Sequence, residues 1–214
     1  MKIQKFTFNY FGENTYVLYD ETGECIIIDP GCSNSNEENS LSDFIEKNKL
    51  KPVLLLNTHC HIDHILGNAF VKNKYQIPLY INQYEEPVLK AGTSISQAYG
   101  IVYSPSPLPD KFIDENDKIN FGNSELDIAF TPGHSPGSLC FINHDYRKII
   151  GGDVLFNGSI GRTDLPGGDF QTLENSIINK LYTMPDEYVV YCGHGEEKTI
   201  GFEKYNNPFV RLKT

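Results

Sequence analysis

Residues 53–64 read VLLLNTHCHIDH, and this stretch constrains the fold more than any other part of the chain. The run VLLLNT is typical of a β-strand that is buried on both faces of a sheet. Four polar side chains follow it closely, in a chain with six histidines in all: His59, His61, Asp63 and His64. A strand end holds side chains rigidly and still exposes them to solvent, so catalytic groups often lie there. The stretch predicts a sheet with a chemically active edge.

The chain around this strand alternates β-rich runs with helical patterns. Runs at 2–8, 15–19 and 25–29, separated by turn-forming residues, predict an antiparallel meander. Leu41, Phe44 and Ile45 recur at helical spacing and predict a helix that ends before Pro52.

The second half of the chain repeats this pattern of β-rich runs followed by helices. β-rich runs at 118–122, 125–132, 138–143 and 148–154 come first. A helix with Leu173, Ile177 and Leu181 on one face follows, with Asp169 as the expected N-cap. A strand at 188–194 and a short C-terminal helix come last. Two meanders, each followed by helices, predict an α/β fold of two sheets packed face to face with helices outside, in one domain over residues 1–214.

Residues 91–110 carry three prolines and little periodicity, so we expect a loop. The loop is either a lid over a site or an excursion on the surface.

Composition excludes several classes of function. The net charge is −10 and no run of Lys or Arg interrupts it, which disfavours binding to nucleic acid or an anionic membrane. The first ten residues contain no apolar core of a signal peptide, and no apolar stretch could cross a bilayer, so we expect a soluble, cytoplasmic protein. Five scattered cysteines without a CxxC pair indicate reduced thiols.

The histidine cluster is best explained as a metal site. A solvated turn would explain one histidine, but chance rarely produces an HxHxDH pattern. Imidazole and carboxylate donors suit zinc, iron or manganese. Four donors this close together cannot all bind one tetrahedral ion comfortably, so the cluster favours two neighbouring ions.

Further ligands should come from other strand ends. His134 lies in FTPGHSPGS, Asp153 in IIGGDVLF and His194 in YCGHGEE, and each of these motifs follows a β-rich run. His144 lies in the polar turn NHDYRK, which indicates a surface residue.

This order of motifs resembles the metallo-β-lactamase superfamily: HxHxDH at 59–64, then GH at 133–134, GD at 152–153 and GH at 193–194, after the strand IIIDPG. The resemblance implies the four-layer αββα sandwich with the metals at one edge of the sheets. It implies one ion held by His59, His61 and His134. A second ion would be held by Asp63, His64 and His194, with Asp153 as the bridge between the two. Asp29 would steady the histidine loop, the alternative being a plain turn residue.

Within the superfamily, the stretch NGSIGRTDLPGGD at 157–169, with GHSPGS, resembles short glyoxalase II-like hydrolases. Asp153 stands where a common class of β-lactamases has Cys, so lactam hydrolysis is not expected. The chain ends about 20 residues after His194, so the C-terminal domain that binds glutathione in well-known glyoxalase II enzymes is expected to be absent. The thiol half of the substrate stays open.

The expected chemistry is hydrolysis of a small-molecule thioester. Two divalent ions, zinc before iron or manganese, would lower the pKa of a shared water and supply a hydroxide that attacks the carbonyl. Asp153 would act as the bridge, and Asp63 could take up a proton. Arg162 and Asp164 would form an ion pair at the pocket floor, with Arg162 and Tyr103 as candidate substrate contacts and Tyr99 a weaker one. Cys60 and Cys192 are expected to be buried and not to bind metal.

Two alternatives remain open at this point. Persulfide dioxygenases of the superfamily share the GRTD stretch and use one iron, which here would be held by His59, His134 and Asp153. A non-catalytic metal-binding protein is the other alternative.

Overall fold

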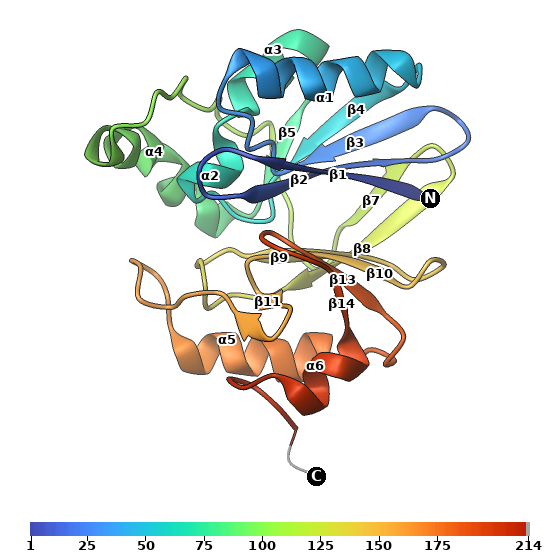
Figure 1. The fold of residues 1–214 in the computed structure, drawn as a ribbon, viewed down its shortest axis with the longest axis vertical. Coiled ribbons are helices and arrows are strands. Elements are labelled where there is room, and N and C mark those ends of the chain that lie inside the picture. The colour runs from blue at the N-terminus through green and yellow to red at the C-terminus, as the bar shows by residue number, and fades with distance from the viewer. Residues whose placement is uncertain (213–214) are drawn as a thin grey trace. The chain divides into compact units, whose positions relative to one another are not determined.

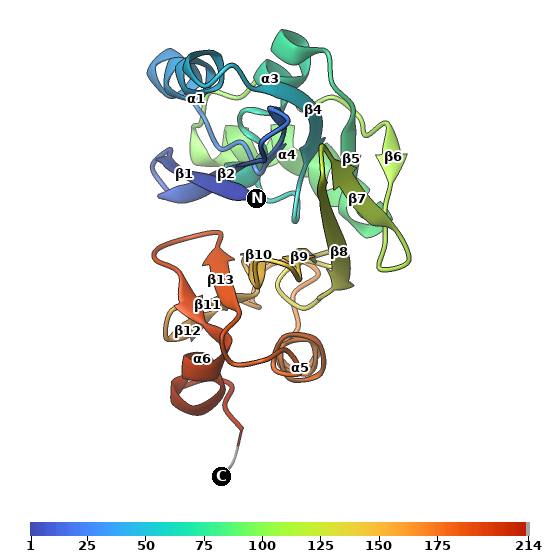
Figure 2. The same cartoon turned by 90° about the vertical axis from the view of Figure 1, so that its right-hand side faces the viewer.

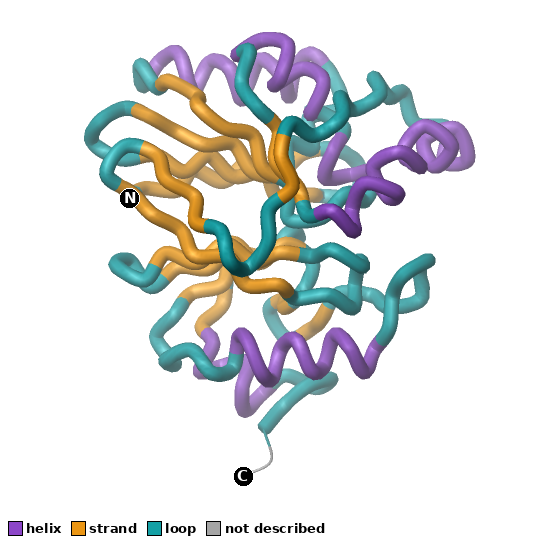
Figure 3. Tube along the Cα trace, turned by 180° about the vertical axis from the view of Figure 1, so that it is seen from behind, coloured by secondary structure: helices purple, strands orange, loops and turns teal. Residues whose placement is uncertain are grey.

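The computed structural model describes residues 1–212 and divides into two compact units (Figure 1). Unit 1 comprises Met1–Ile113 and the hairpin tip Asn120–Glu125; unit 2 comprises Asp114–Ile119 and the chain from Leu126 onward. Each unit is built on a six-stranded sheet. Figure 3 shows the strands in orange and the helices in purple. The single domain that the sequence predicts stays a prediction.

The sheet of unit 1 has the strand order β1-β2-β3-β4-β5-β6. Its strands are β1 (Lys2–Phe8), β2 (Glu13–Tyr19), β3 (Glu24–Ile28), β4 (Lys51–Leu56), β5 (Leu79–Ile81) and β6 (Lys111–Phe112). The first three strands pair antiparallel, which confirms the predicted meander. From β3 to β6 the pairing is parallel, so the carboxyl ends of β3 and β4 meet at one edge of the sheet.

Helices cover one face of this sheet. They are α1 (Ser35–Lys47), α2 (Ile62–Ile65), α3 (Asn68–Tyr75), the 3₁₀ turn η1 (Gln83–Glu85) and α4 (Glu86–Tyr99). Figure 1 shows α1 and α3 above the strands. Leu41 and Ile45 of α1 lie in one buried cluster with Val17, Ile27 and Leu55 of the sheet, which confirms the helix predicted from their spacing.

The expectation of a loop over 91–110 is wrong for its first half. Helix α4 continues to Tyr99 and ends at Gly100, which has φ +66°. The residues that α4 buries are Leu89, Gly92 and Ser96, at helical spacing. Two of them are small, so the buried face carries little apolar signal in the sequence. Residues 100–110 are irregular, and their role as a lid stays a prediction.

The sheet of unit 2 has the order β14-β13-β10-β9-β8-β7. Its strands are β7 (Lys118–Phe121), β8 (Ser124–Phe130), β9 (Leu139–Asn143), β10 (Lys148–Gly152), β13 (Val189–Cys192) and β14 (Lys198–Thr199), and β11 (Leu155–Phe156) and β12 (Ser159–Ile160) form a separate hairpin. β10 and β13 are parallel neighbours, whereas β9 pairs antiparallel with both β8 and β10.

Helices α5 (Phe170–Ser176) and α6 (Ile200–Asn206) cover one face of the unit-2 sheet (Figure 2). Asp169 caps α5 by accepting a hydrogen bond from Thr172 N at 2.8 Å, as predicted. The helix continues as a π-helical turn, η2 (Ile177–Leu181). Leu173, Ile177 and Leu181 are all fully buried in the core of the unit, as their spacing predicts.

Two expectations from composition can be checked on residues 1–212. Every helix there is too short or too polar to cross a bilayer. All five cysteines are free and buried, which confirms the expectation of reduced thiols.

Candidate metal centre

The histidine loop, residues 57–64, leaves the carboxyl end of β4. Asp29 follows β3, the parallel neighbour of β4, so the sheet itself brings Asp29 to this loop. Asp29 Oδ1 accepts a hydrogen bond from Thr58 N at 2.7 Å and Oδ2 accepts one from Thr58 Oγ1 at 2.5 Å. His64 Nδ1 lies 3.1 Å from Asp29 Oδ2. Asp29 thus contacts both ends of the loop.

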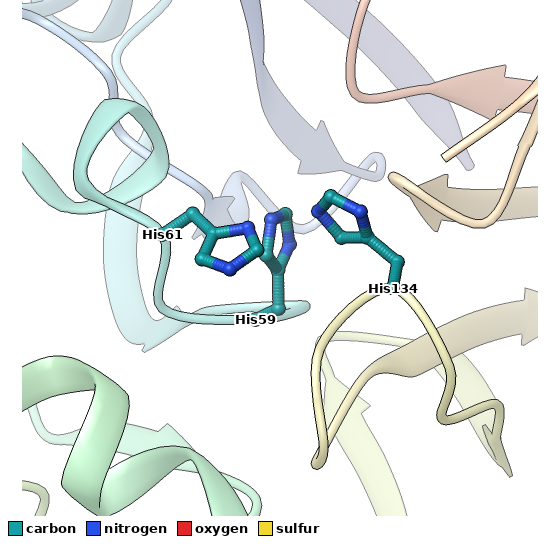
Figure 4. Close-up of side chains that lie close together, drawn as sticks. All are labelled: His59, His61 and His134. Carbon is teal, nitrogen blue, oxygen red and sulfur yellow. The ribbon is translucent and has the colours of Figure 1, made fainter. Parts of the chain in front are cut away.

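Asp29, His59 and His64 form a buried cluster in which one donor atom from each lies within 4.8 Å of the others. The rings of His59 and His64 are 4.1 Å apart between centroids. His61, at the N-terminus of α2, packs edge-on to His59 with centroids 4.9 Å apart, and Figure 4 shows both side chains leaving the loop after β4. Asp63 is 13% exposed, and its Oδ2 lies 3.6 Å from His64 Nε2.

The hydrogen bonds assign the tautomers of two of these histidines. The Thr58 hydroxyl donates its one proton to Asp29, so the contact of 3.1 Å between Thr58 Oγ1 and His59 Nδ1 needs the proton on His59. The Asp29 carboxylate likewise requires a proton on His64 Nδ1. Both rings therefore carry their lone pair on Nε2, the arrangement in which a histidine binds a metal while Nδ1–H holds it in place.

Two buried carboxylates that the sequence analysis missed also lie beside this loop. Glu13 is fully buried, and its Oε1 lies 3.8 Å from His64 Nδ1. Burial raises the pKa of Glu13 well above its ordinary value, although the nearby His64 opposes the rise. Glu85 is also fully buried, and its Oε2 accepts a hydrogen bond from Cys60 N at 2.7 Å. Neither stands in a recognisable motif, so no pattern in a single sequence marks them.

Unit 2 brings together His134, Asp153 and His194 from three strand ends. His134 lies in the loop between β8 and β9 (Figure 4), Asp153 follows β10, and His194 follows β13. β10 and β13 are parallel, so the last two residues meet at one edge of the sheet.

Asp153 lies between two imidazoles. His134 Nε2 and His194 Nε2 each lie 3.5 Å from Asp153 Oδ2. Two donors on one tetrahedral ion, each about 2.1 Å from it, are roughly 3.4 Å apart. The spacing fits a carboxylate that shares an ion with each histidine.

The backbone of the GRTD stretch holds His134. His134 Nδ1 lies 2.7 Å from the carbonyl oxygen of Arg162, which only accepts, so this histidine also carries its lone pair on Nε2. The three assigned tautomers and the carboxylates between the rings make the donor set suitable for divalent transition metals.

The structure also shows the contacts of the residues predicted to shape the pocket or bind the substrate. Arg162 forms the predicted ion pair with Asp164, through two contacts of 2.7 Å, and this pair lowers the pKa of Asp164 to about 2. Tyr103 is half-buried, and its hydroxyl accepts a hydrogen bond from Ser106 N at 2.8 Å. The substrate roles of Arg162 and Tyr103 stay predictions.

The residues that the sequence predicts to be neither metal ligands nor substrate contacts have the predicted burial or exposure. Cys60 and Cys192 are buried, and burial raises the pKa of each thiol. His144 is exposed and contacts Tyr188 and Asp127.

Comparison with known proteins identifies the family to which the chain belongs. Residues 9–194 match the family model described as the metallo-beta-lactamase superfamily. The chain is 40% identical to "Probable metallo-hydrolase YqgX" of Bacillus subtilis over 200 residues, 92% of each chain. It is 34% identical to "Hydroxyacylglutathione hydrolase GloC" of Haemophilus influenzae over the full length of both.

Two solved structures are closely similar. The "BLEG-1 B3 metallo-beta-lactamase" matches with a TM-score of 0.89 at 34% identity, over 98% of this chain and 99% of that one. "TTHA1623 in a di-iron-bound form" matches with a TM-score of 0.87 at 31% identity, over 97% and 100%. These similarities confirm the predicted fold class. The chain belongs to the metallo-β-lactamase superfamily, and the two relatives named above carry the names of a probable metallo-hydrolase and a hydroxyacylglutathione hydrolase.

Proposed function

We propose that this protein is a thioester hydrolase of the glyoxalase II type that uses two divalent metal ions. The observation that carries the proposal is the donor set, in which three imidazoles have Nδ1 held and Nε2 carrying the lone pair, beside the carboxylates of Asp63 and Asp153. The identity of 34% to a hydroxyacylglutathione hydrolase over the whole chain supports the choice of substrate class.

The proposed ligands divide into two sets joined by one carboxylate. His59, His61 and His134 would hold one ion. Asp63, His64 and His194 would hold the other, with Asp153 shared by both. When bound, two such ions lower the pKa of a shared water and supply a hydroxide at neutral pH. We propose zinc as the ion, with iron or manganese as alternatives; the di-iron form of a structural neighbour supports iron.

The chain's own residues supply position and proton transfer. Asp29 and the Arg162 carbonyl hold His64 and His134 through Nδ1, which keeps each Nε2 aimed away from its anchor. Asp63, with its side chain 13% exposed, would take up the remaining proton of the hydroxide after its attack and pass it to the leaving thiolate, which gives a carboxylate and a thiol.

Metal stoichiometry tests the two-ion centre. Protein purified without chelator should contain about two ions per chain, counted as zinc, iron and manganese together. Asp153→Ala should lose both activity and stoichiometric metal, because one carboxylate serves both ions. His144→Ala, at an exposed histidine, should keep both. Full thioesterase activity in Asp153→Ala would contradict the proposal, as would loss of metal in His144→Ala.

A substrate panel tests the reaction. S-lactoylglutathione is the first thioester to assay. Hydrolysis of a β-lactam without thioester hydrolysis would favour a lactamase activity, which the name of the BLEG-1 neighbour carries. One iron per chain with oxygen consumption on glutathione persulfide would favour the dioxygenase alternative.

A further inference from the structure

The turn between β1 and β2 exposes two aromatic side chains. We name residues 9–12 the aromatic turn. Tyr10 is 104% exposed and Phe11 is 43% exposed. Exposed aromatic rings contribute nothing to the core, and a group of them on a folded surface marks a binding site more often than a structural need.

Hydrogen bonds hold the backbone of the aromatic turn in place. Asn9 adopts φ +52°, its Oδ1 accepts from Phe11 N at 2.9 Å, and its backbone N donates to Glu37 Oε1 at 2.9 Å. Glu37 is itself fixed at the start of α1, where its Oε2 accepts from Ser33 N at 2.7 Å. The rings are therefore presented on a fixed support, which lowers the entropy lost when they bind a ligand.

The aromatic turn is attached to the histidine loop. Asn9 Nδ2 donates to the carbonyl oxygen of Asp63 at 3.1 Å and to that of Gly31 at 2.9 Å. Asp63 is one of the proposed metal ligands, so a single side chain links the exposed rings to the proposed reaction centre. All these residues belong to unit 1.

A third aromatic side chain joins the group from another element. Tyr99, the last residue of α4, is 61% exposed and packs edge-to-face against Phe11, with centroids 6.3 Å apart and planes at 85°. This arrangement is the favourable one for two aromatic rings. It leaves open ring surface on both residues.

We propose that Tyr10, Phe11 and Tyr99 form a subsite for an apolar group of the substrate, namely an aryl or branched alkyl group next to the thioester. This inference rests on the proposed function. The Glu37 carboxylate accepts the backbone N–H of Asn9 and brings negative charge to the base of the turn, which disfavours a carrier with several phosphates there. The preferred substrate is therefore a thioester with an apolar substituent on its acyl or thiol side.

Matched substrates separate these two sides. On the acyl side, S-phenylacetylglutathione is compared with S-acetylglutathione. On the thiol side, the acetyl thioester of 2-phenylethanethiol is compared with that of ethanethiol. The wild-type protein should prefer the phenyl member of one pair by about 3- to 10-fold in kcat/KM, the range expected for aromatic contacts.

Phe11→Ala and Tyr99→Ala should each remove this preference by raising KM for the phenyl substrate, with little effect on its unsubstituted partner. Tyr10→Ser adds a variant at a fully exposed position, where substitution cannot disturb the core. Tyr205→Ala on α6 is the matched control, because Tyr205 is 51% exposed and lies in unit 2. Equal KM changes for both members of a pair, or an unchanged preference in all three variants, would overturn the subsite.

A binding measurement tests the subsite without turnover. S-benzylglutathione and S-methylglutathione are thioethers that cannot be hydrolysed, and calorimetry on the purified, metal-loaded protein gives their affinities. The benzyl compound should bind about 3- to 10-fold more tightly, and Phe11→Ala should abolish the difference. If no thioester is hydrolysed but this difference is found and then lost in the variant, the proposed function fails and the apolar subsite stands. If hydrolysis occurs with no phenyl preference in either substrate pair and no benzyl preference in binding, the subsite fails alone.

Discussion

Glu85 acts on the histidine loop from 25 residues away in sequence. Its carboxylate accepts the backbone N–H of Cys60, the residue between His59 and His61. Asp29 holds the same loop from the side of β3. The resemblance to the superfamily implies a role for Asp29, in the strand motif IIIDPG, but a backbone contact such as that of Glu85 leaves no pattern along the chain.

Substitution of Glu85 should loosen the loop. Glu85→Ala leaves a buried N–H without its acceptor, which costs about 1–3 kcal/mol of stability, and it should weaken metal affinity about 10-fold or more, as changes in groups that support metal ligands do. Glu85→Gln keeps an acceptor oxygen and should restore most of the affinity. Competition with a chromophoric chelator measures this directly. Equal metal affinity in Glu85→Ala and the wild type would show that the contact does not position the ligands.

The elements of this fold were predictable where apolar residues define a face. Leu173, Ile177 and Leu181 mark α5 and its continuation, and the meander follows from its β-rich runs. Helix α4 was missed because Gly92 and Ser96 occupy its buried face. The loop between β8 and β9, which packs against α5, depends on another glycine: Gly133 adopts φ +128°, and a Cβ there would collide with the backbone of Leu173.

Gly133→Ala should therefore destabilise unit 2 and displace the adjacent His134. The expected loss is about 3 kcal/mol, because a strained φ and a backbone clash combine. Gly158→Ala is the matched control: its φ is +70°, but a Cβ there meets no described heavy atom within 4 Å, so only strain of about 1 kcal/mol is expected. Thermal unfolding and metal content measure both effects. Similar losses in the two variants would contradict the role given to the Leu173 contact.

At the scale of the whole molecule, the chain passes from unit 1 to unit 2 and briefly returns. The hairpin tip 120–125 belongs to unit 1, where Asp20 Oδ2 accepts from Asn123 N at 2.7 Å and from Ser124 Oγ at 2.9 Å. Burial raises the pKa of Asp20, but hydrogen bonds from Thr22, Ser124 and Asn123 outweigh it, so the pKa lies below its ordinary value. The sequence could not predict this contact, because its partners are about 100 residues apart.

Asp20 should make stability depend on pH. A carboxylate whose pKa is lower in the folded state stabilises the protein above its unfolded pKa of about 3.9, and this contribution is lost as the pH falls through the folded pKa. Asp20→Asn should cost about 2 kcal/mol at pH 7 and progressively less below about pH 4. Urea unfolding at pH 7, 5 and 3 measures the difference. A constant cost of Asp20→Asn at all three pH values would contradict this pH dependence.

The burial of all five thiols has a consequence if the proposed function holds, because a thioester hydrolase releases a thiol at each turnover. Burial raises the pKa of Cys25, Cys140 and Cys192 to about 12, and it raises those of Cys32 and Cys60 as well. Thiolates are the reactive form in disulfide exchange, so at neutral pH these side chains are almost entirely unreactive. A leaving thiol that becomes oxidised would find no partner on this protein for a mixed disulfide, and the enzyme would resist inactivation by its own product.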